Sequence, residues 1–257
     1  MPTPLRFRML LVPFLTALVA ADPKAKRCDH KELRSADGLL GCTSLDFHFD
    51  PLSATELQAV AKVVGDGSIG VFICRGCAIG AAGMEVIGPA LLNQDRVGFL
   101  TIREDTIGAV GATYLAQLLN QSTKLSGLDL RGAGLGSGGP TLAAALRHPD
   151  SALQILNLKV SGLGTAGAVE VAAALRENTE LQWLDLSFNT LGDQGAAALA
   201  ASLAERDESL TLHLEDRSVG RAAGRETSSR PSPPLPHVAR TWPPCMEPPR
   251  TNRACAG

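Results

Sequence analysis

The sequence predicts an α/β solenoid, in which short parallel strands form one face and helices form the other. The first observation is a 28-residue repeat of leucine-type positions at Phe72, Leu100, Leu128, Leu156, Leu184 and Leu212. The second is a pair of glycine rows in the same frame, at Gly80, Gly108, Gly136, Gly164 and Gly192 and at Gly83, Gly111, Gly139, Gly167 and Gly195. A fixed period of this length is typical of proteins that stack one supersecondary unit on the next.

Each repeat contains a strand, a turn and a helix in that order. Alternating leucines, as in LQWLDL at residues 181–186, predict a strand whose leucines point into the core. We expect these strands to begin near residues 71, 99, 127, 155 and 183, and an earlier copy at 45–64 is one residue shorter. The alanine-rich stretch at 195–205 predicts a helix that is capped by Asp193 and buries Leu199 and Leu203.

The pattern LxxLxLxxN/CxLGxxGxxxLAxxL resembles the leucine-rich repeats of the ribonuclease-inhibitor type over residues 42–217. The resemblance implies a horseshoe of six to seven repeats, with a parallel sheet on its concave side that recognises proteins. The asparagine that bonds the turns in this family occurs only as Asn189, which leaves the regularity of the middle turns open. Its counterparts are Asp50, Cys77, Asp105, Ala133, Ser161 and Arg217. Cysteine is an ordinary variant here, so we expect Cys77 to be a buried thiol and Cys74 a core residue, not a redox or metal pair.

The two ends of the chain differ from the repeats in composition. Residues 1–21 run from basic to apolar to small side chains and predict a cleaved secretory signal peptide. An uncleaved anchor and an organellar targeting segment are the alternatives. Residues 22–41 form an N-terminal cap, in which we expect a disulfide between Cys28 and Cys42. Residues 218–257 hold eight of the 16 prolines and predict a disordered basic tail, where Cys245 and Cys255 are a second candidate pair.

Charge and motifs exclude several classes of function. Residues 22–217 carry 16 basic and 24 acidic side chains, which argues against general nucleic-acid binding. GxGxxG occurs at both 134–139 and 162–167, one repeat apart, so it marks the turn of the repeat and not a dinucleotide site. The histidines lack metal-ligand spacing, and no nucleophile is paired with a base. We therefore predict no cofactor and no catalysis.

The candidate binding residues lie between and after the strand leucines, where side chains point away from the core. The position after the second leucine is basic in four successive repeats, at Arg75, Arg103, Arg131 and Lys159. The alternative is a solvated face, with Arg131 partly neutralised by Asp129. Further candidates are the polar residues between the leucines and two aromatic anchors that flank the last of them: Asp129, Asn157, Asp185, Trp183 and Phe188. The expected ligand is a protein partner with an acidic patch.

Asn120 begins a glycosylation sequon, Asn-Gln-Ser, which we expect in a surface loop between a helix and a strand. Together these features favour a secreted or lumenal, non-catalytic protein-binding module without stable membrane insertion. One alternative is an intracellular regulatory or scaffold repeat protein of inhibitor, adaptor or GTPase-activating type, in the cytoplasm or an organelle. Another is that the chain is a fragment or spliced variant of a longer repeat protein.

Overall fold

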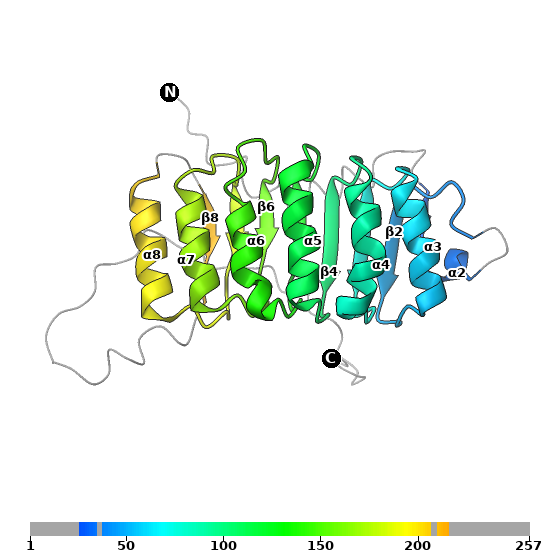
Figure 1. Ribbon diagram of the computed structural model, residues 1–257, viewed down its shortest axis with the longest axis horizontal. Helices are drawn as coiled ribbons and strands as arrows, with labels where there is room; N and C mark the ends of the chain where they lie inside the picture. Colours follow the sequence, from blue (N-terminus) through cyan, green and yellow to red (C-terminus); the bar gives the residue numbers. More distant parts are fainter. Residues whose placement is uncertain (1–25, 35–37, 207–209, 216–257) are drawn as a thin grey trace, which may run out of the picture. The chain divides into compact units, whose positions relative to one another are not determined.

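A computed structural model describes residues 26–34, 38–206 and 210–215 (Figure 1). The strands in these residues form one parallel sheet, and their order in the sheet is their order in the sequence. They are β1 (Arg27–Cys28), β2 (Ser44–His48), β3 (Val71–Arg75), β4 (Phe99–Arg103), β5 (Gly127–Asp129), β6 (Ile155–Asn157), β7 (Trp183–Asp185) and β8 (Thr211–His213). The predicted strand starts at 71, 99, 127, 155 and 183 are confirmed, and so is the α/β solenoid.

The main helices lie side by side and cover one face of the sheet (Figure 1). The other face, which carries no helix of the described residues, is called the open face below. The helices are α2 (His30–Leu33), α3 (Ala54–Gly65), α4 (Gly80–Leu92), α5 (Gly108–Gln121), α6 (Gly139–Ala145), α7 (Gly164–Leu175) and α8 (Gly192–Ala204). A short 3-10 helix, η3 (Gly136–Gly138), precedes α6.

The core lies between the sheet and the helices and consists mainly of the repeated leucines. Leu128, Leu156 and Leu184 stand in register on adjacent strands, and each is fully buried. Ala168 and Ala172 of α7 are buried as well, because small side chains let neighbouring helices pack closely. Each repeat therefore buries its apolar side chains only when its neighbours are folded beside it.

The two glycine rows have different physical roles. In the first row, which includes Gly164, φ lies between +54° and +67° at all five positions, a left-handed conformation that glycine adopts readily. In the second row the constraint is space. A Cβ added to Gly111 would lie 2.5 Å from Ile107, and one added to Gly167 would lie 2.6 Å from Leu163. The first row sets the backbone angle at the start of each helix, and the second allows close packing.

Asn189 bonds the backbones of two successive turns. Its Oδ1 accepts hydrogen bonds from the N–H groups of Ser161 and Leu163, both at 3.1 Å. Its Nδ2 donates to the carbonyl oxygens of Leu158 at 2.6 Å and Leu186 at 2.9 Å. This one side chain therefore pairs buried backbone groups that lack a partner within their own strand or helix.

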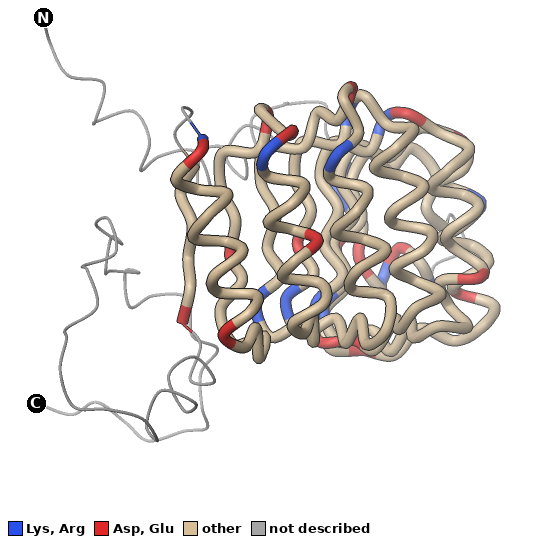
Figure 2. Tube along the Cα trace, turned by 60° about the vertical axis from the view of Figure 1, so that its left-hand side comes forward, with Lys and Arg blue, Asp and Glu red and all other residues tan. Residues whose placement is uncertain are grey.

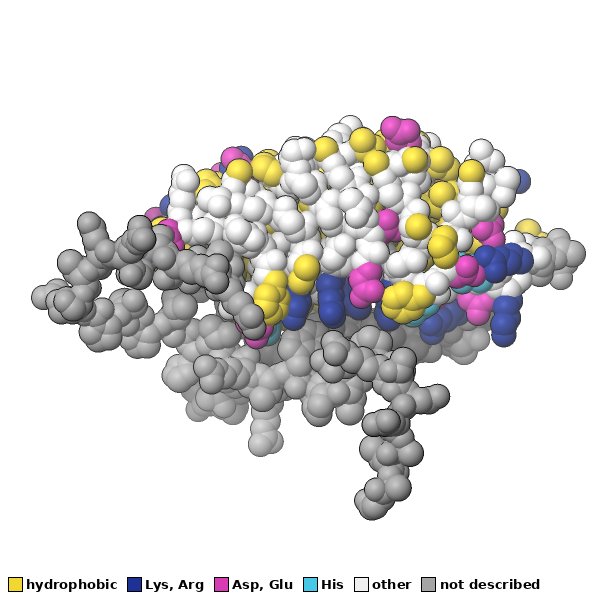
Figure 3. All heavy atoms as spheres, turned by 90° about the horizontal axis from the view of Figure 1, so that it is seen from below, with side chains coloured by type: hydrophobic (Ala, Val, Ile, Leu, Met, Phe, Trp, Pro, Cys, Tyr) yellow, Lys and Arg dark blue, Asp and Glu magenta, His cyan; other side chains and the backbone are white. Residues whose placement is uncertain are grey.

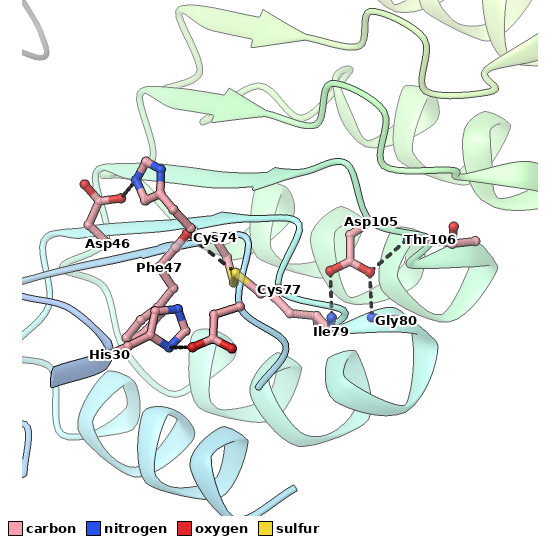
Figure 4. The surroundings of a disulfide bond; sticks show 11 residues. His30, Asp46, Phe47, Cys74, Cys77, Ile79, Gly80, Asp105 and Thr106 are labelled. Carbon is pink, nitrogen blue, oxygen red and sulfur yellow. Dashed lines mark hydrogen bonds and ion pairs between the residues drawn. A yellow bond between two sulfur atoms is a disulfide. The ribbon is translucent and has the colours of Figure 1, made fainter. Parts of the chain in front are cut away.

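Asp105, near the other end of the sheet, accepts backbone hydrogen bonds in the way that Asn189 does, although it is not an asparagine. Its carboxylate accepts hydrogen bonds from the N–H groups of Ile79 at 2.6 Å and Gly80 at 2.9 Å (Figure 4). A carboxylate supplies the acceptor half of the asparagine side chain but no donor. Sequence inspection treats Asp105 as a departure from the repeat, whereas in the structure it bonds one turn to the next.

The least regular repeat has Ala133 at the position of this asparagine. Its turn still bonds to the next repeat, because the N–H of Leu135 donates to the carbonyl of Ser161 at 2.7 Å. Its helical part is divided into η3 and the seven-residue α6. Gly138-Gly139-Pro140 favours this break, since glycine is a poor helix former and proline starts helices without continuing them. The irregularity therefore lies in the helix and not in the turn.

The described residues contain two disulfides. Cys28 and Cys42 are joined and tie the N-terminal cap to the first full repeat. Cys74 and Cys77 are also joined, so the expectation of a free buried thiol at Cys77 is wrong. Cys74 faces the core from β3, and the turn brings Cys77 back to a Cα–Cα distance of 5.9 Å, which is within the range of a disulfide.

Asp193 lies in the first turn of α8, but its side chain does not cap that helix, contrary to expectation. The helix begins one residue earlier, at Gly192, so the carboxylate can favour the helix only through the helix dipole. The predicted signal segment, 1–21, and the predicted tail, 218–257, lie outside the described residues. In the part of the chain that the structure describes, no helix is long and apolar enough to cross a membrane.

Candidate protein-binding face

The four basic residues Arg75, Arg103, Arg131 and Lys159, called the basic column below, lie at the ends of successive strands beside the open face. Arg75 and Arg103 end β3 and β4 and are register partners. Arg131 and Lys159 stand two residues beyond the ends of β5 and β6, in the turns. Figure 2 shows Lys and Arg positions gathered near this end of the sheet. The column is therefore built partly from strands and partly from turns.

Backbone hydrogen bonds keep the column in line where the strands have ended. The N–H of Glu104 donates to the carbonyl of Arg131 at 2.9 Å, and the N–H of Gly132 donates to the carbonyl of Lys159 at 2.9 Å. Between the first two members, the N–H of Gly76 donates to the carbonyl of Arg103 at 2.8 Å. Because these bonds continue the parallel ladder, adjacent members stand about 4.8 Å apart, the spacing of neighbouring strands.

One carboxylate lies within the column, but it pairs differently from expectation. Asp129 forms an ion pair with Arg103, on the preceding strand, and not with Arg131. The register partner of Asp129 on β4 is Thr101, and Arg103 reaches the carboxylate from two residues further along that strand. Among the described residues, Arg75, Arg131 and Lys159 form no ion pair with a carboxylate. Burial, and then the charge of Arg103, lowers the pKa of Arg75.

The polar residues between the leucines hold the turns that present the basic side chains. The side-chain oxygen of Asp129 accepts the N–H of Arg131 at 3.2 Å, and that of Asn157 accepts the N–H of Lys159 at 3.0 Å. Asp185 does the same for the N–H of Ser187 at 2.9 Å. Such contacts to the amide two residues ahead are typical of Asx turns. These three predicted binding residues thus have a structural task that the sequence pattern did not reveal.

The two aromatic candidates have different surroundings. Trp183 opens β7 and is half-buried, with its ring centroid 5.3 Å from that of His213 on β8. Phe188 follows the end of β7 and is exposed, and the Nζ of Lys159 lies 5.1 Å from its ring centroid. That distance is suitable for a cation–π interaction. Phe188 therefore extends the basic column with an exposed ring, while Trp183 packs against its neighbouring strand.

Comparison with known proteins supports the architecture. The model of one family, "Leucine Rich repeat", matches residues 177–200, which include β7 and the first part of α8. The chain has the fold of a leucine-rich-repeat solenoid. A solved structure described as "Leiomodin-1 Actin-Binding Site 2 (ABS2)" is similar at 14% identity and a TM-score of 0.40, over 63% of this chain and 79% of that chain. Similarity at this level gives no information about what this solenoid binds. No curated protein sequence matches the chain.

Sequence inspection missed one feature of the solenoid, a row of residues with positive φ directly after the basic column. Each N–H in this row donates to the carbonyl of the residue at the column position one repeat further on. The row has φ between +51° and +67° and consists of Phe49, Gly76, Glu104, Gly132, Val160 and Phe188. The signal in the sequence was the glycine at two of these positions, which marks a left-handed slot.

Asn120 lies at the C-terminal end of α5 and not in a loop, which corrects the expected position of the sequon. The helix simply continues one residue beyond it before the chain extends at Ser122. The Asn120 side chain is exposed, whereas Ser122 is buried and its hydroxyl accepts the N–H of Leu125 at 3.1 Å. The sequon is therefore accessible at its asparagine but engaged in local structure at its serine.

Proposed function

We propose that this solenoid is a non-catalytic protein-binding module of the ribonuclease-inhibitor-like type, and that its basic column binds an acidic patch of a protein partner. The observation that carries the proposal is the alignment of four basic residues at strand spacing, of which only Arg103 forms an ion pair with a carboxylate of the described residues. Three cationic side chains remain without an ion pair among the described residues, so an acidic partner supplies what the chain itself does not.

Electrostatics favours such a ligand. Two unit charges at about 5 Å repel by roughly 0.8 kcal/mol in water, and the side chains of the column relieve only part of this by spreading apart. Carboxylates of a partner placed between Arg75, Arg131 and Lys159 remove the remaining repulsion and add attraction. Trp183 and Phe188 supply apolar contact area at one end of the column, and aromatic rings of this kind often anchor interfaces.

We further propose that the protein acts in the secretory pathway or outside the cell. The signal-like residues 1–21 and the disulfide between Cys28 and Cys42 support this location, because such bonds persist in oxidising compartments. Expression of the full chain with a C-terminal tag, followed by measurement of the tag in medium and cell fractions, tests it. A mobility shift abolished by Asn120→Gln would show glycosylation, and retention of the tag in the cytoplasm would favour the intracellular alternative.

Affinity capture with a matched pair of variants tests the binding proposal. Arg131 is exposed and forms no ion pair in the described residues, so Arg131→Glu changes the charge of the column without breaking a contact. Lys124→Glu makes the same change of charge at an exposed residue outside the column. We expect the unaltered chain and Lys124→Glu to recover acidic proteins equally, and Arg131→Glu to recover about fivefold less, which corresponds to the loss of about 1 kcal/mol from one exposed ion pair. Equal recovery by all three baits would refute the proposal.

A further inference from the structure

Three large apolar side chains are exposed at one structurally equivalent position of the repeat. They are Phe49, Val160 and Phe188, with exposed fractions of 63%, 51% and 39%. All three have positive φ, at 51°, 56° and 61°. Bulky and β-branched residues rarely adopt this conformation. A large apolar side chain that stays exposed to water also adds no hydrophobic stabilisation to the fold. Neither the backbone nor the core accounts for these residues.

The same slot in other repeats shows that the solenoid does not need an apolar residue there. Gly76 and Gly132 occupy it with φ of 61° and 67°, and the turn keeps the same hydrogen bond to the next repeat. Residues held in costly backbone conformations are concentrated at functional sites. The apolar residues at this slot therefore point to contact with something outside the described chain.

Both rings lie against members or neighbours of the basic column. The Phe49 ring lies over Gly76, the residue after Arg75, since a Cβ on that glycine would be 3.0 Å from the Cδ1 of Phe49. At the other end, the Phe188 ring lies under Lys159, and Val160 is the next residue in the chain. In Figure 3 hydrophobic atoms lie beside the row of Lys and Arg side chains at two places. The basic column is thus bordered by apolar groups at both ends.

We propose that this edge binds an extended acidic segment of a protein partner with an apolar residue at each end. The partner's carboxylates lie over the basic column, one apolar residue packs on Phe49, and the other packs on Val160 and Phe188. Phe49 and Phe188 are five strand steps apart, which is about 24 Å at 4.8 Å per step. In an extended segment of eight residues the first and last Cα atoms are seven steps apart, which is about 24 Å at about 3.4 Å per step. This inference rests on the proposed function and specifies its partner.

Glycine substitutions give a test that does not depend on a damaged fold. Phe49→Gly and Phe188→Gly place at these slots the residue that other repeats already carry, so the fold is retained. The probe is a fluorescently labelled peptide with six alternating Glu and Asp residues between two leucines, and the control peptide has serine at both ends. We expect each glycine variant to weaken binding of the leucine-ended peptide about tenfold, the effect of removing one well-buried apolar contact. Val110→Ala, at an exposed residue of α5, should leave binding unchanged.

The outcomes separate this inference from the proposed function. Equal affinity for the leucine-ended and serine-ended peptides, or no effect of either glycine variant, overturns the two-ended segment. If Arg131→Glu still weakens binding in that case, recognition of acidic protein by the basic column stands. If Arg131→Glu has no effect either, or neither peptide binds, both proposals fail. Tight binding of the leucine-ended peptide, lost in both glycine variants, supports the inference.

Discussion

Gly164 offers a direct test of why the first glycine row exists. Its φ is +67°, and a Cβ added there would have no atom within 4 Å apart from its own chain neighbours. Space is therefore available, and the constraint is the left-handed backbone. The left-handed conformation raises the energy of an L-residue by roughly 1–2 kcal/mol, and by less for Asn, which adopts this region more readily. We expect a destabilisation of about 1–2 kcal/mol for Gly164→Ala, less for Gly164→Asn, and more for Gly164→Val.

Gly167 is the matched control, three residues further along the same repeat. A Cβ at this position would lie 2.6 Å from the Cδ1 of Leu163, a side chain that is only 2% exposed. Overpacking of this kind costs about 1–3 kcal/mol and grows with the size of the side chain. The ranking of Asn and Ala at position 167 is therefore the opposite of that at position 164, and Gly167→Asn should be more destabilising than Gly167→Ala.

Urea unfolding of the full chain, followed by far-ultraviolet circular dichroism, measures these free energies from the midpoints and slopes. Unfolding of Gly164→Val should also become less cooperative, because the substitution weakens the middle of a linear array. The reasoning is refuted if Asn is more damaging than Ala at position 164, since that order would show that space and not the backbone angle limits this site. Unchanged unfolding curves would refute it as well.

Three further predictions concern the turns, the cap and acid stability. Asn189→Ala should cost about 2 kcal/mol, because it leaves the buried N–H of Leu163 without an acceptor, whereas the N–H of Ser161 keeps the carbonyl of Leu158; a loss below about 1 kcal/mol in urea unfolding would contradict this. Replacing Cys28 and Cys42 with serine should cost about 3 kcal/mol for a sequence separation of 14, measured in the same way; an unchanged midpoint would show that the cap does not need the bond. Arg34, by its hydrogen bond, lowers the pKa of Glu56 from 4.5 to about 2, so the stability from this pair is present above pH 4.5 and is lost as the pH falls toward 2. Arg34→Ala should return that pKa toward 4.5 in a carboxyl titration followed by nuclear magnetic resonance.

The repeat period was sufficient to predict the strands because it repeats the same burial pattern in every unit. Leu128, Leu156 and Leu184 lie in register for that reason. The same periodicity placed the basic residues in one column. What period alone could not predict was hydrogen bonding by individual side chains, which depends on backbone angles and on the rotamer that each residue adopts. Asp105 replaced the expected asparagine for this reason, and Asp129 paired with Arg103 instead of Arg131.

The path of the backbone through the turns was the second feature that the sequence did not predict. The disulfide between Cys74 and Cys77 depends on a turn that folds back onto its own strand, and a spacing of three residues does not reveal that return. The exposed row of Phe49, Val160 and Phe188 was also hidden, since three apolar residues in a sequence give no sign that their backbone is left-handed. Only the glycines in the equivalent slots, Gly76 and Gly132, carried that information.

The association rate of the leucine-ended acidic peptide, measured by stopped-flow fluorescence at several salt concentrations, tests the central claim most directly. Charged steering makes this rate fall with salt, and removal of a charge in the column should make it slower and less salt-dependent. We predict a steep salt dependence for the unaltered chain and for Lys124→Glu, and a slower rate with a shallower slope for Arg131→Glu. Identical rates and slopes for all three proteins would contradict recognition of acidic partners by the basic column.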